Sequence, residues 1–186
     1  MKPLKKRYDE LEGKLQLIRR EAVPPRPGGR ARFEIDISRY EYCHGKEATE
    51  IDEFTVFVYT PAMILCEKIR ALCQQAPTYS KFVHKHRAPR ARDIFDIHET
   101  TTRLKIDLVT RENSELVRKM FQAKRVPIDL LLTLENEREF HRQAWDAVRD
   151  TVDPSIRLRS YDYYFDYALD QCSRIAQLLG LNPRGT

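Results

Sequence analysis

The stretch DEFTVFVYTPAMILCEKIRALC, residues 52–73, passes directly from a strand pattern into a helix pattern. Residues 52–60 are rich in β-branched and aromatic side chains, which favours a strand. Thr60 and Pro61 then indicate a helix start, because threonine is a good N-cap and proline suits the first helical turn. The apolar spacing predicts a helix over residues 61–75 that stops before Pro77.

Upstream of this stretch the sequence predicts one more strand and one more helix. Residues 30–41 alternate between apolar and polar side chains, which is typical of a half-buried strand; the apolar members are Phe33, Ile35 and Ile37. Residues 4–22 have apolar side chains at helical spacing among charges, which favours an amphipathic helix. The run PPRPGG at 24–29 separates the two elements, because proline and glycine together stop either one.

Downstream the chain has helical spacing almost to its end. We expect helices over residues 90–99, 113–124, 127–150 and 160–180. Asn113 or Ser114 would cap the second of these, and Gly180 would close the last. The fold class is therefore α+β, with two strands in front of a helical bundle. We expect a sheet region over residues 1–60 and a helical domain over residues 61–186.

Composition narrows the class of protein. The chain has 186 residues, of which 41% are hydrophobic and 33% charged, and this is a globular composition. No apolar run approaches the ~20 residues of a membrane helix and no signal-peptide core follows the N-terminus, so we expect a cytosolic protein without a membrane partner. The net charge of +5 permits a polyanionic partner without requiring one. The four cysteines form no CxxC pair and are expected to be reduced and mostly buried; they are Cys43, Cys66, Cys73 and Cys172.

Lys68 lies on an apolar face of the helix expected over residues 61–75. Its neighbours three and four residues away are Ile64, Leu65, Ala71 and Leu72. A lysine in such a place must find an anion or lose its proton, because burying an isolated charge is costly. Three interpretations stay open from the spacing: a side chain that reaches past the apolar face to solvent, a structural bridge to Asp93 or Asp96, or a functional cation.

The stretch RAPRARDIFDIHE, residues 87–99, supplies the candidate anions. Asp93 and Asp96 share one helix face, and Arg90 and Arg92 come just before both of them. An aspartate in the first turn of a helix is often a cap, so this interpretation of Asp93 competes with a catalytic one. For Asp96 the interpretation that competes with a functional one is a carboxylate that is solvated or paired with an arginine.

Other groups with functional chemistry are less specific. Glu34 and Asp36 point the same way on the first expected strand, where they are magnesium ligands, a base or simply the solvent-facing side of the sheet. His84 and His86, with His98, lack zinc spacing and indicate a basic loop. Trp145 is expected in the core, and YDYYFDY at 161–167 is expected to form core and interface, although its rings are also suited to base stacking.

Taken together, RFEIDIS, the strand that ends in a Thr-Pro helix start, ILCEKIRALC and RARDIFDI resemble the AbiEii/AbiGii-type nucleotidyltransferase-like toxins. These belong to the polymerase-β-like nucleotidyltransferase superfamily and occur in abortive phage infection and toxin–antitoxin pairs. The resemblance covers roughly residues 30–100. It implies a short portion of a nucleotidyltransferase sheet followed by a mainly helical domain.

The resemblance also implies an activity: transfer of a nucleotidyl group from a nucleoside triphosphate to an acceptor, either an RNA such as the end of a tRNA or a protein. Lys68 would lie against the triphosphate, with Arg92 and Asp96 in the nucleotide site. Asp93 would be the partnering acid. Asp36, with Glu34 beside it, would help to hold Mg²⁺ or prepare the acceptor.

The sequence departs from the family pattern at its first motif, a Gly-Ser turn followed by a metal-binding Asp-x-Asp pair. No Gly-Ser dipeptide is present, and Glu34-x-Asp36 follows Gly28-Gly29 too closely. We therefore expect the rear portion of such an enzyme, a subunit completed by a second chain, or a degenerate copy, with an antitoxin as a further partner. The alternatives are a non-catalytic module that binds a nucleotide, RNA or a partner, and a helical interaction protein in which Lys68 and Asp93 form a structural bridge.

Overall fold

The computed structural model describes residue 14, residues 40–79 and residues 86–182 of the chain. The helix expected over residues 4–22, apart from residue 14, and the strand residues 33–37 lie outside the described part. The expected division into residues 1–60 and 61–186 stays a prediction. Residues from Tyr40 onward belong to one compact unit, which contains all the elements below.

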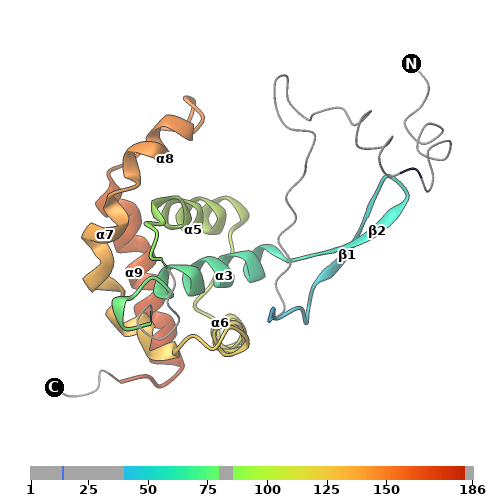
Figure 1. Ribbon diagram of the computed structural model, residues 1–186, viewed down its shortest axis with the longest axis horizontal. Coiled ribbons are helices and arrows are strands. Elements are labelled where there is room, and N and C mark those ends of the chain that lie inside the picture. The colour runs from blue at the N-terminus through green and yellow to red at the C-terminus, as the bar shows by residue number, and fades with distance from the viewer. Residues whose placement is uncertain (1–13, 15–39, 80–85, 183–186) are drawn as a thin grey trace. The chain divides into compact units, whose positions relative to one another are not determined.

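The described part consists of a two-stranded sheet and seven helices, which confirms the α+β class (Figure 1). In chain order the elements are β1 (Glu47–Ile51), β2 (Phe54–Val58), α3 (Pro61–Cys73), α5 (Ala91–Leu104), α6 (Arg111–Ala123), the 3₁₀-helix η1 (Ile128–Glu137), α7 (Arg138–Arg142), α8 (Trp145–Thr151) and α9 (Tyr161–Leu178). None of the described helices is both long enough and apolar enough to span a bilayer.

The two strands form an antiparallel hairpin in which β2 is shorter than the expected strand and β1 was not expected at all. Asp52 and Glu53 form its two-residue turn, and both have positive φ, 47° and 69°. Turns of this kind usually carry asparagine or glycine. Because Asp52 is followed by glutamate and not by glycine, the turn carries no hairpin signal, and the run EATEI of β1 has little of the strand pattern either.

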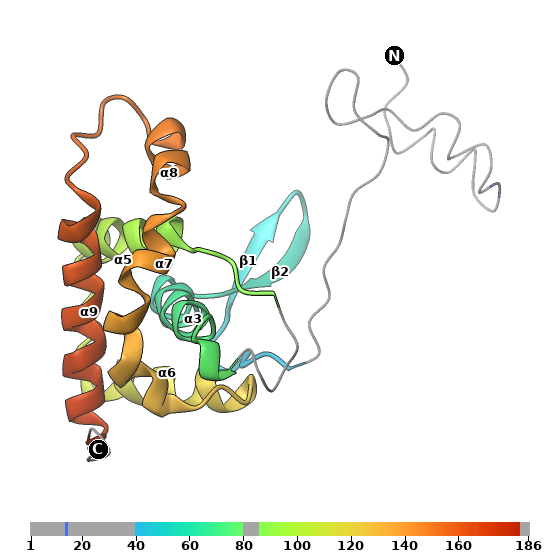
Figure 2. The same cartoon turned by 60° about the vertical axis from the view of Figure 1, so that its left-hand side comes forward.

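Helix α3 begins where the sequence predicted, because the Thr60 hydroxyl accepts a hydrogen bond from the Met63 amide at 3.2 Å. Its buried face is apolar and fully covered; the residues are Leu65, Cys66, Ile69, Leu72 and Cys73. This face packs against α5, α6 and η1. Figures 1 and 2 show α3 between these helices, with the hairpin continuing from its N-terminal end. The central position of α3 places Lys68 beside α5.

Helices α5 and α6 differ from their expected bounds at identifiable residues. Helix α5 continues to Leu104 and ends at Lys105, which adopts the left-handed conformation with φ 53°. Helix α6 begins at Arg111 with Thr110 as its N-cap, whose hydroxyl accepts from the Asn113 amide at 3.1 Å. The expectation that Asn113 or Ser114 caps this helix is therefore wrong: Asn113 supplies the capped amide, and Ser114 is fully buried.

The single helix expected over residues 127–150 is instead three short ones, η1, α7 and α8. Leu131, Leu134 and Glu137 are buried at a spacing of three residues. Residues three apart lie in line on a 3₁₀-helix, so this spacing suits the tighter geometry of η1 as well as an α-helix. The periodicity alone could not distinguish the two.

Helix α9 closes the bundle and confirms most of the expectations for the C-terminal region. The Ser160 hydroxyl caps it by accepting from the Tyr163 amide, and Gly180 follows its end with φ 67°. Trp145 packs against the rings of Tyr161 and Tyr164 at 5.7 and 5.5 Å. The aromatic run is largely core, with Tyr163 exposed. Three of the four free cysteines are buried, whereas Cys43 is exposed.

Candidate functional site

The candidate site lies where the middle of α3 faces the first two turns of α5. The Lys68 ammonium donates to Asp93 Oδ1 and to Asp96 Oδ2, both at 2.8 Å. Because Asp93 and Asp96 are three residues apart on α5, their carboxylates lie on the same side of the helix and meet one cation. The side chain of Lys68 is 23% exposed and that of Asp93 is 10% exposed, so the pair is mostly buried.

Two arginines complete this group. Arg90 Nε donates to the second oxygen of Asp93, and Arg92 Nε donates to the second oxygen of Asp96 at 2.9 Å. The result is a row of alternating charges, from Arg90 through Asp93, Lys68 and Asp96 to Arg92, with a net charge of one positive unit. We call these five residues the lysine–aspartate centre.

Lys68 is a permanent cation at neutral pH. Burial by itself lowers the pKa of its ammonium group, but the hydrogen bonds and charges of Asp93 and Asp96 outweigh it and raise the pKa above the ordinary value. A lysine held in this form can neutralise an anion such as a phosphate, but it cannot act as a base or a nucleophile. Two of its three N–H donors are used by the two aspartates, and the described residues use no third.

A cavity of about 300 Å³ lies directly beside Lys68. Lys68, Arg90 and Asp93 line one part of it, and the residues around the rest include Tyr59, Ile64 and Gln74. Burial, together with the charges of Glu41, Cys43 and Glu67, raises the pKa of the Tyr59 phenol, so this side chain is neutral at physiological pH. The cavity therefore presents cations and a neutral hydroxyl together with the carboxylates of Glu67 and Asp93.

Arg90 and Asp93 also line a second cavity, of about 440 Å³, between the start of α5 and α8. The α8 side of this cavity is formed by small and apolar residues such as Ala147 and Val148, together with Thr151. Arg92 lines it as well and donates to the Thr151 hydroxyl at 3.2 Å. The Arg90–Asp93 pair is thus a wall shared by two cavities.

The structure brings together four of the predicted site residues: Lys68, Asp93, Asp96 and Arg92. The remaining two, Glu34 and Asp36, lie outside the described residues, so their roles stay predictions. For Lys68 the interpretation as a bridge is confirmed, with both aspartates as partners. This bridge is closed, as a structural role requires, yet a cavity lies beside it, as a binding role requires.

The carboxylates of the lysine–aspartate centre do not fit a magnesium ion. All four oxygens of Asp93 and Asp96 accept from cationic side chains, which compete with a metal for the same lone pairs. Within residues 40–79 and 86–182, no three side chains of the metal-binding types lie close enough to hold an ion. A magnesium site on Glu34 and Asp36 therefore stays a prediction. The basic loop expected at His84 and His86 is described only at His86, which is exposed.

Sequence reasoning missed a set of buried polar residues behind the lysine–aspartate centre. Gln75, Glu137 and His141 are 4%, 6% and 0% exposed, respectively. All three contact residues 87–90, the segment that leads into α5. Their sequence positions gave no signal, because each stands alone in a region that was interpreted only for its apolar spacing.

Comparison with known proteins identifies the family. The model of one protein family, described as nucleotidyl transferase AbiEii toxin of type IV toxin–antitoxin systems, matches residues 6–171. The match covers most of the chain and extends well beyond residues 30–100, on which the resemblance in the sequence rests. A match of this extent shows the family to which the chain belongs. Neither a curated protein nor a solved structure gives a significant match.

Proposed function

Because the chain belongs to the AbiEii nucleotidyl transferase toxin family, we propose that its lysine–aspartate centre binds the triphosphate of a nucleoside triphosphate during nucleotidyl transfer. One observation carries this proposal: the Lys68 ammonium, fixed by Asp93 and Asp96, borders a cavity of about 300 Å³. A cavity of this size is at the lower end of the range for small-molecule sites. Lys68 and Arg90 would place positive charge where the triphosphate lies.

In the proposed reaction an acceptor hydroxyl attacks the α-phosphorus. A bond from that phosphorus to the acceptor oxygen forms, and its bond to the bridging oxygen breaks, so that pyrophosphate leaves with the electron pair. The acceptor proton passes to a carboxylate, for which Asp36 is the proposed group. Lys68 contributes by neutralising charge that develops on the phosphate oxygens, and Asp93 contributes by holding Lys68 and Arg90 in place.

The acceptor would occupy the second cavity, of about 440 Å³. Donor and acceptor must meet at the reacting phosphorus, and Arg90 and Asp93 are the residues that line both cavities. RNA, including a tRNA end, and a protein hydroxyl are both candidate acceptors. Mg²⁺ on Glu34 and Asp36, an antitoxin partner and a second chain that supplies the first motif also belong to this proposal.

The first experiment measures thermal unfolding of the full chain with each of the four nucleoside triphosphates and Mg²⁺. We expect one triphosphate to raise the melting temperature of the wild type and of Lys119→Met, but not of Lys68→Met. Lys119 is an exposed lysine on α6 that does not line the cavity, which makes it a matched control. Equal stabilisation of all three proteins, or stabilisation of none by any triphosphate, would contradict the proposed site.

A second experiment identifies the acceptor. The protein is incubated with the stabilising triphosphate labelled at the α-phosphorus, together with either total RNA or the protein alone. Label in the RNA, or label in the polypeptide, would each support transfer and name the acceptor class. Nucleotide binding without label in either would instead favour the alternative of a non-catalytic nucleotide-binding module, which the closed ion pairs of Lys68 also allow.

A further inference from the structure

Residues 87–90, which lead into α5, are held by side chains from three other elements. Gln75 follows α3, Glu137 ends η1, and His141 lies on α7. These three are among the eight buried polar or charged residues of the described part of the chain. Buried polar groups are costly unless they are paired, so three of them around one short segment require an explanation.

Gln75 contacts the segment at two points. Its side-chain oxygen accepts from the Ala88 amide at 2.9 Å, and its main-chain oxygen accepts from Arg87 Nε. The side-chain nitrogen of Gln75 donates back to the Ala71 carbonyl at 3.2 Å, which fixes the orientation of the amide. The segment is thereby tied to the end of α3, the helix that carries Lys68.

Glu137 and His141 hold the segment from the other side. The Glu137 carboxylate pairs with Arg87, whose guanidinium also lies over the ring of Phe140 at 3.9 Å. His141 Nδ1 accepts from the Arg90 amide at 3.1 Å. These bonds join residues about fifty positions apart in the sequence, so they fix a tertiary arrangement rather than a local turn.

His141 is an uncharged acceptor under ordinary conditions. Burial, and then the charges of Arg87 and Arg90, lower its pKa to about 4, although Asp93 acts in the opposite direction. The ring is therefore neutral at pH 7, with Nδ1 unprotonated toward the Arg90 amide and the proton on Nε2. A neutral, buried acceptor of this kind holds the amide in one position.

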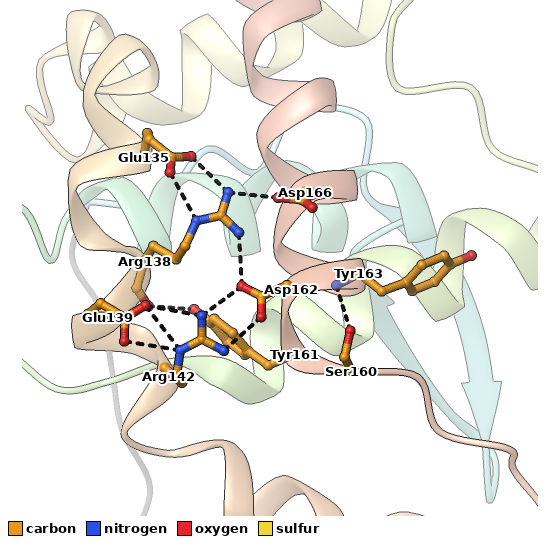
Figure 3. Close-up of polar contacts among 9 residues, drawn as sticks. All are labelled: Glu135, Arg138, Glu139, Arg142, Ser160, Tyr161, Asp162, Tyr163 and Asp166. Atoms are coloured by element: carbon orange, nitrogen blue, oxygen red, sulfur yellow. Dashed lines mark hydrogen bonds and ion pairs between the residues drawn. The ribbon is translucent and has the colours of Figure 1, made fainter.

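Helix α7 is itself anchored to α9, so His141 is presented from a fixed support. Figure 3 shows Arg138 and Arg142, on either side of His141 in sequence, reaching Asp162 and Asp166. Arg142 Nη2 lies 2.6 Å from Asp162 Oδ1, and Arg138 Nη2 lies 2.6 Å from Asp166 Oδ1. The Tyr161 hydroxyl also donates to the Arg138 carbonyl at 2.8 Å, again between α9 and α7.

The residue fixed by His141 is part of the lysine–aspartate centre. Arg90 is the N-cap residue of α5, and its side chain donates to Asp93, which in turn accepts from Lys68. A displacement of the Arg90 main chain would move the guanidinium and the first turn of α5 together. Even a small displacement matters, because misplacing reacting groups by about 1 Å can lower the reaction rate on the order of a hundredfold.

We propose that Gln75, Glu137 and His141 are positioning residues for the lysine–aspartate centre, and that they set the distance between Asp93 and Lys68 through the segment 87–90. This inference rests on the proposed function for the claim that the centre binds a nucleotide. The geometric part, that these residues set the environment of the Lys68 ammonium, is independent of it.

The test compares His141→Asn with His141→Leu, and uses His86→Leu as a control at an exposed histidine near the same segment. Asparagine places an oxygen near the position of Nδ1 and keeps an acceptor for the Arg90 amide, whereas leucine removes it. Two quantities are measured: the affinity for the stabilising triphosphate by calorimetry, and the pKa of Lys68 by NMR of its Cε and Nζ resonances, assigned through Lys68→Ala.

We expect His141→Leu to weaken triphosphate binding at least tenfold and to lower the pKa of Lys68 toward its ordinary value. His141→Asn should stay within threefold of the wild type, and His86→Leu should be unchanged. If His141→Leu fails to fold, Gln75→Met replaces it, because it removes the acceptor of the Ala88 amide and leaves His141 in place. A folded His141→Leu or Gln75→Met with the affinity and the Lys68 pKa of the wild type would overturn the proposal.

The two measurements separate this inference from the proposed function. A wild type that binds no triphosphate, but whose Lys68 pKa falls in His141→Leu, refutes nucleotide binding and supports positioning. A wild type that binds a triphosphate equally well in all variants, with an unchanged Lys68 pKa, supports the proposed function and refutes positioning.

Discussion

Replacing Lys68 by methionine is expected to lower the free energy of unfolding by about 1–2 kcal/mol. Methionine keeps most of the aliphatic stem, so the change removes mainly the ammonium group and its two ion pairs. The Nζ atom of Lys68 lies 2.8 Å from an oxygen of Asp93 and 2.8 Å from an oxygen of Asp96.

The magnitude follows from the burial and from the remaining partners. An exposed ion pair contributes about 0–1 kcal/mol, whereas removing one partner of a buried pair costs about 3–5 kcal/mol. The higher cost arises from a charge that is left unpaired, but here Asp93 keeps Arg90 and Asp96 keeps Arg92. Each lost pair should therefore cost no more than about 1 kcal/mol.

Urea unfolding of the wild type, Lys68→Met and the control Lys119→Met measures this cost. The double variant Lys68→Met/Arg90→Met should be less stable than the sum of the single changes, because Asp93, only 10% exposed, then loses both cations. A loss above 3 kcal/mol in Lys68→Met alone would refute the reasoning that the arginines still pair the aspartates. Strict additivity in the double variant would refute it as well.

The dependence of this contribution on pH has a definite sign. The folded-state pKa of Lys68 is raised, so its contribution is fully present below the ordinary lysine pKa and disappears as the pH rises through the raised value. The difference in stability between wild type and Lys68→Met should therefore be constant from pH 6 to pH 9 and shrink only in strong alkali.

The remaining predictions concern His141 and the end of α5. The pKa of His141 is lowered to about 4 in the folded state, so as the pH falls this histidine is protonated in the unfolded chain before it is protonated in the folded one. The free energy of unfolding should therefore decrease between pH 6.5 and pH 4, by at most about 3 kcal/mol from this group. Urea unfolding across this range should show a shallower decline for His141→Asn than for the wild type, and parallel curves would contradict the assignment. Lys105→Gly should raise stability by up to about 1 kcal/mol in thermal unfolding, because Lys105 has φ 53° and glycine adopts this conformation without strain. Lys105→Ala, which keeps the strain, should give no gain, and an equal gain in both variants would contradict a backbone cause.

The sequence predicted correctly those features that depend only on the residue types within a few positions of one another. Thr60 and Pro61 placed the start of α3 correctly, and the apolar neighbours of Lys68 identified a lysine that needs an anion. The i, i+3 spacing of Asp93 and Asp96 put both carboxylates on one face, where the structure finds them both on Lys68. In each case the inference needed only local geometry.

The rest depended on contacts that local patterns do not encode. The hairpin turn at Asp52 and Glu53 uses positive φ without glycine, so strand β1 gave no signal. The spacing of the residues after Pro127 suited both an α-helix and a 3₁₀-helix. His141 and Glu137 could not be assigned a role, because their partners are about fifty residues away in the sequence.

Under the proposed function, the pairing of Lys68 explains how this lysine can hold a phosphate. An unpaired lysine on the apolar face of α3 would either lose its proton, and with it the charge that attracts a phosphate, or turn to solvent and lose its fixed position beside the cavity. Asp93 and Asp96 keep the ammonium charged and fixed, while Arg90 and Arg92 offset both aspartates, so the centre retains one positive charge and one N–H donor beyond those the described residues use. Removing either arginine would shift this balance and leave an aspartate to compete with the phosphate for Lys68. If the centre binds a triphosphate as proposed, the two arginines are needed for this binding even where they do not themselves contact the anion.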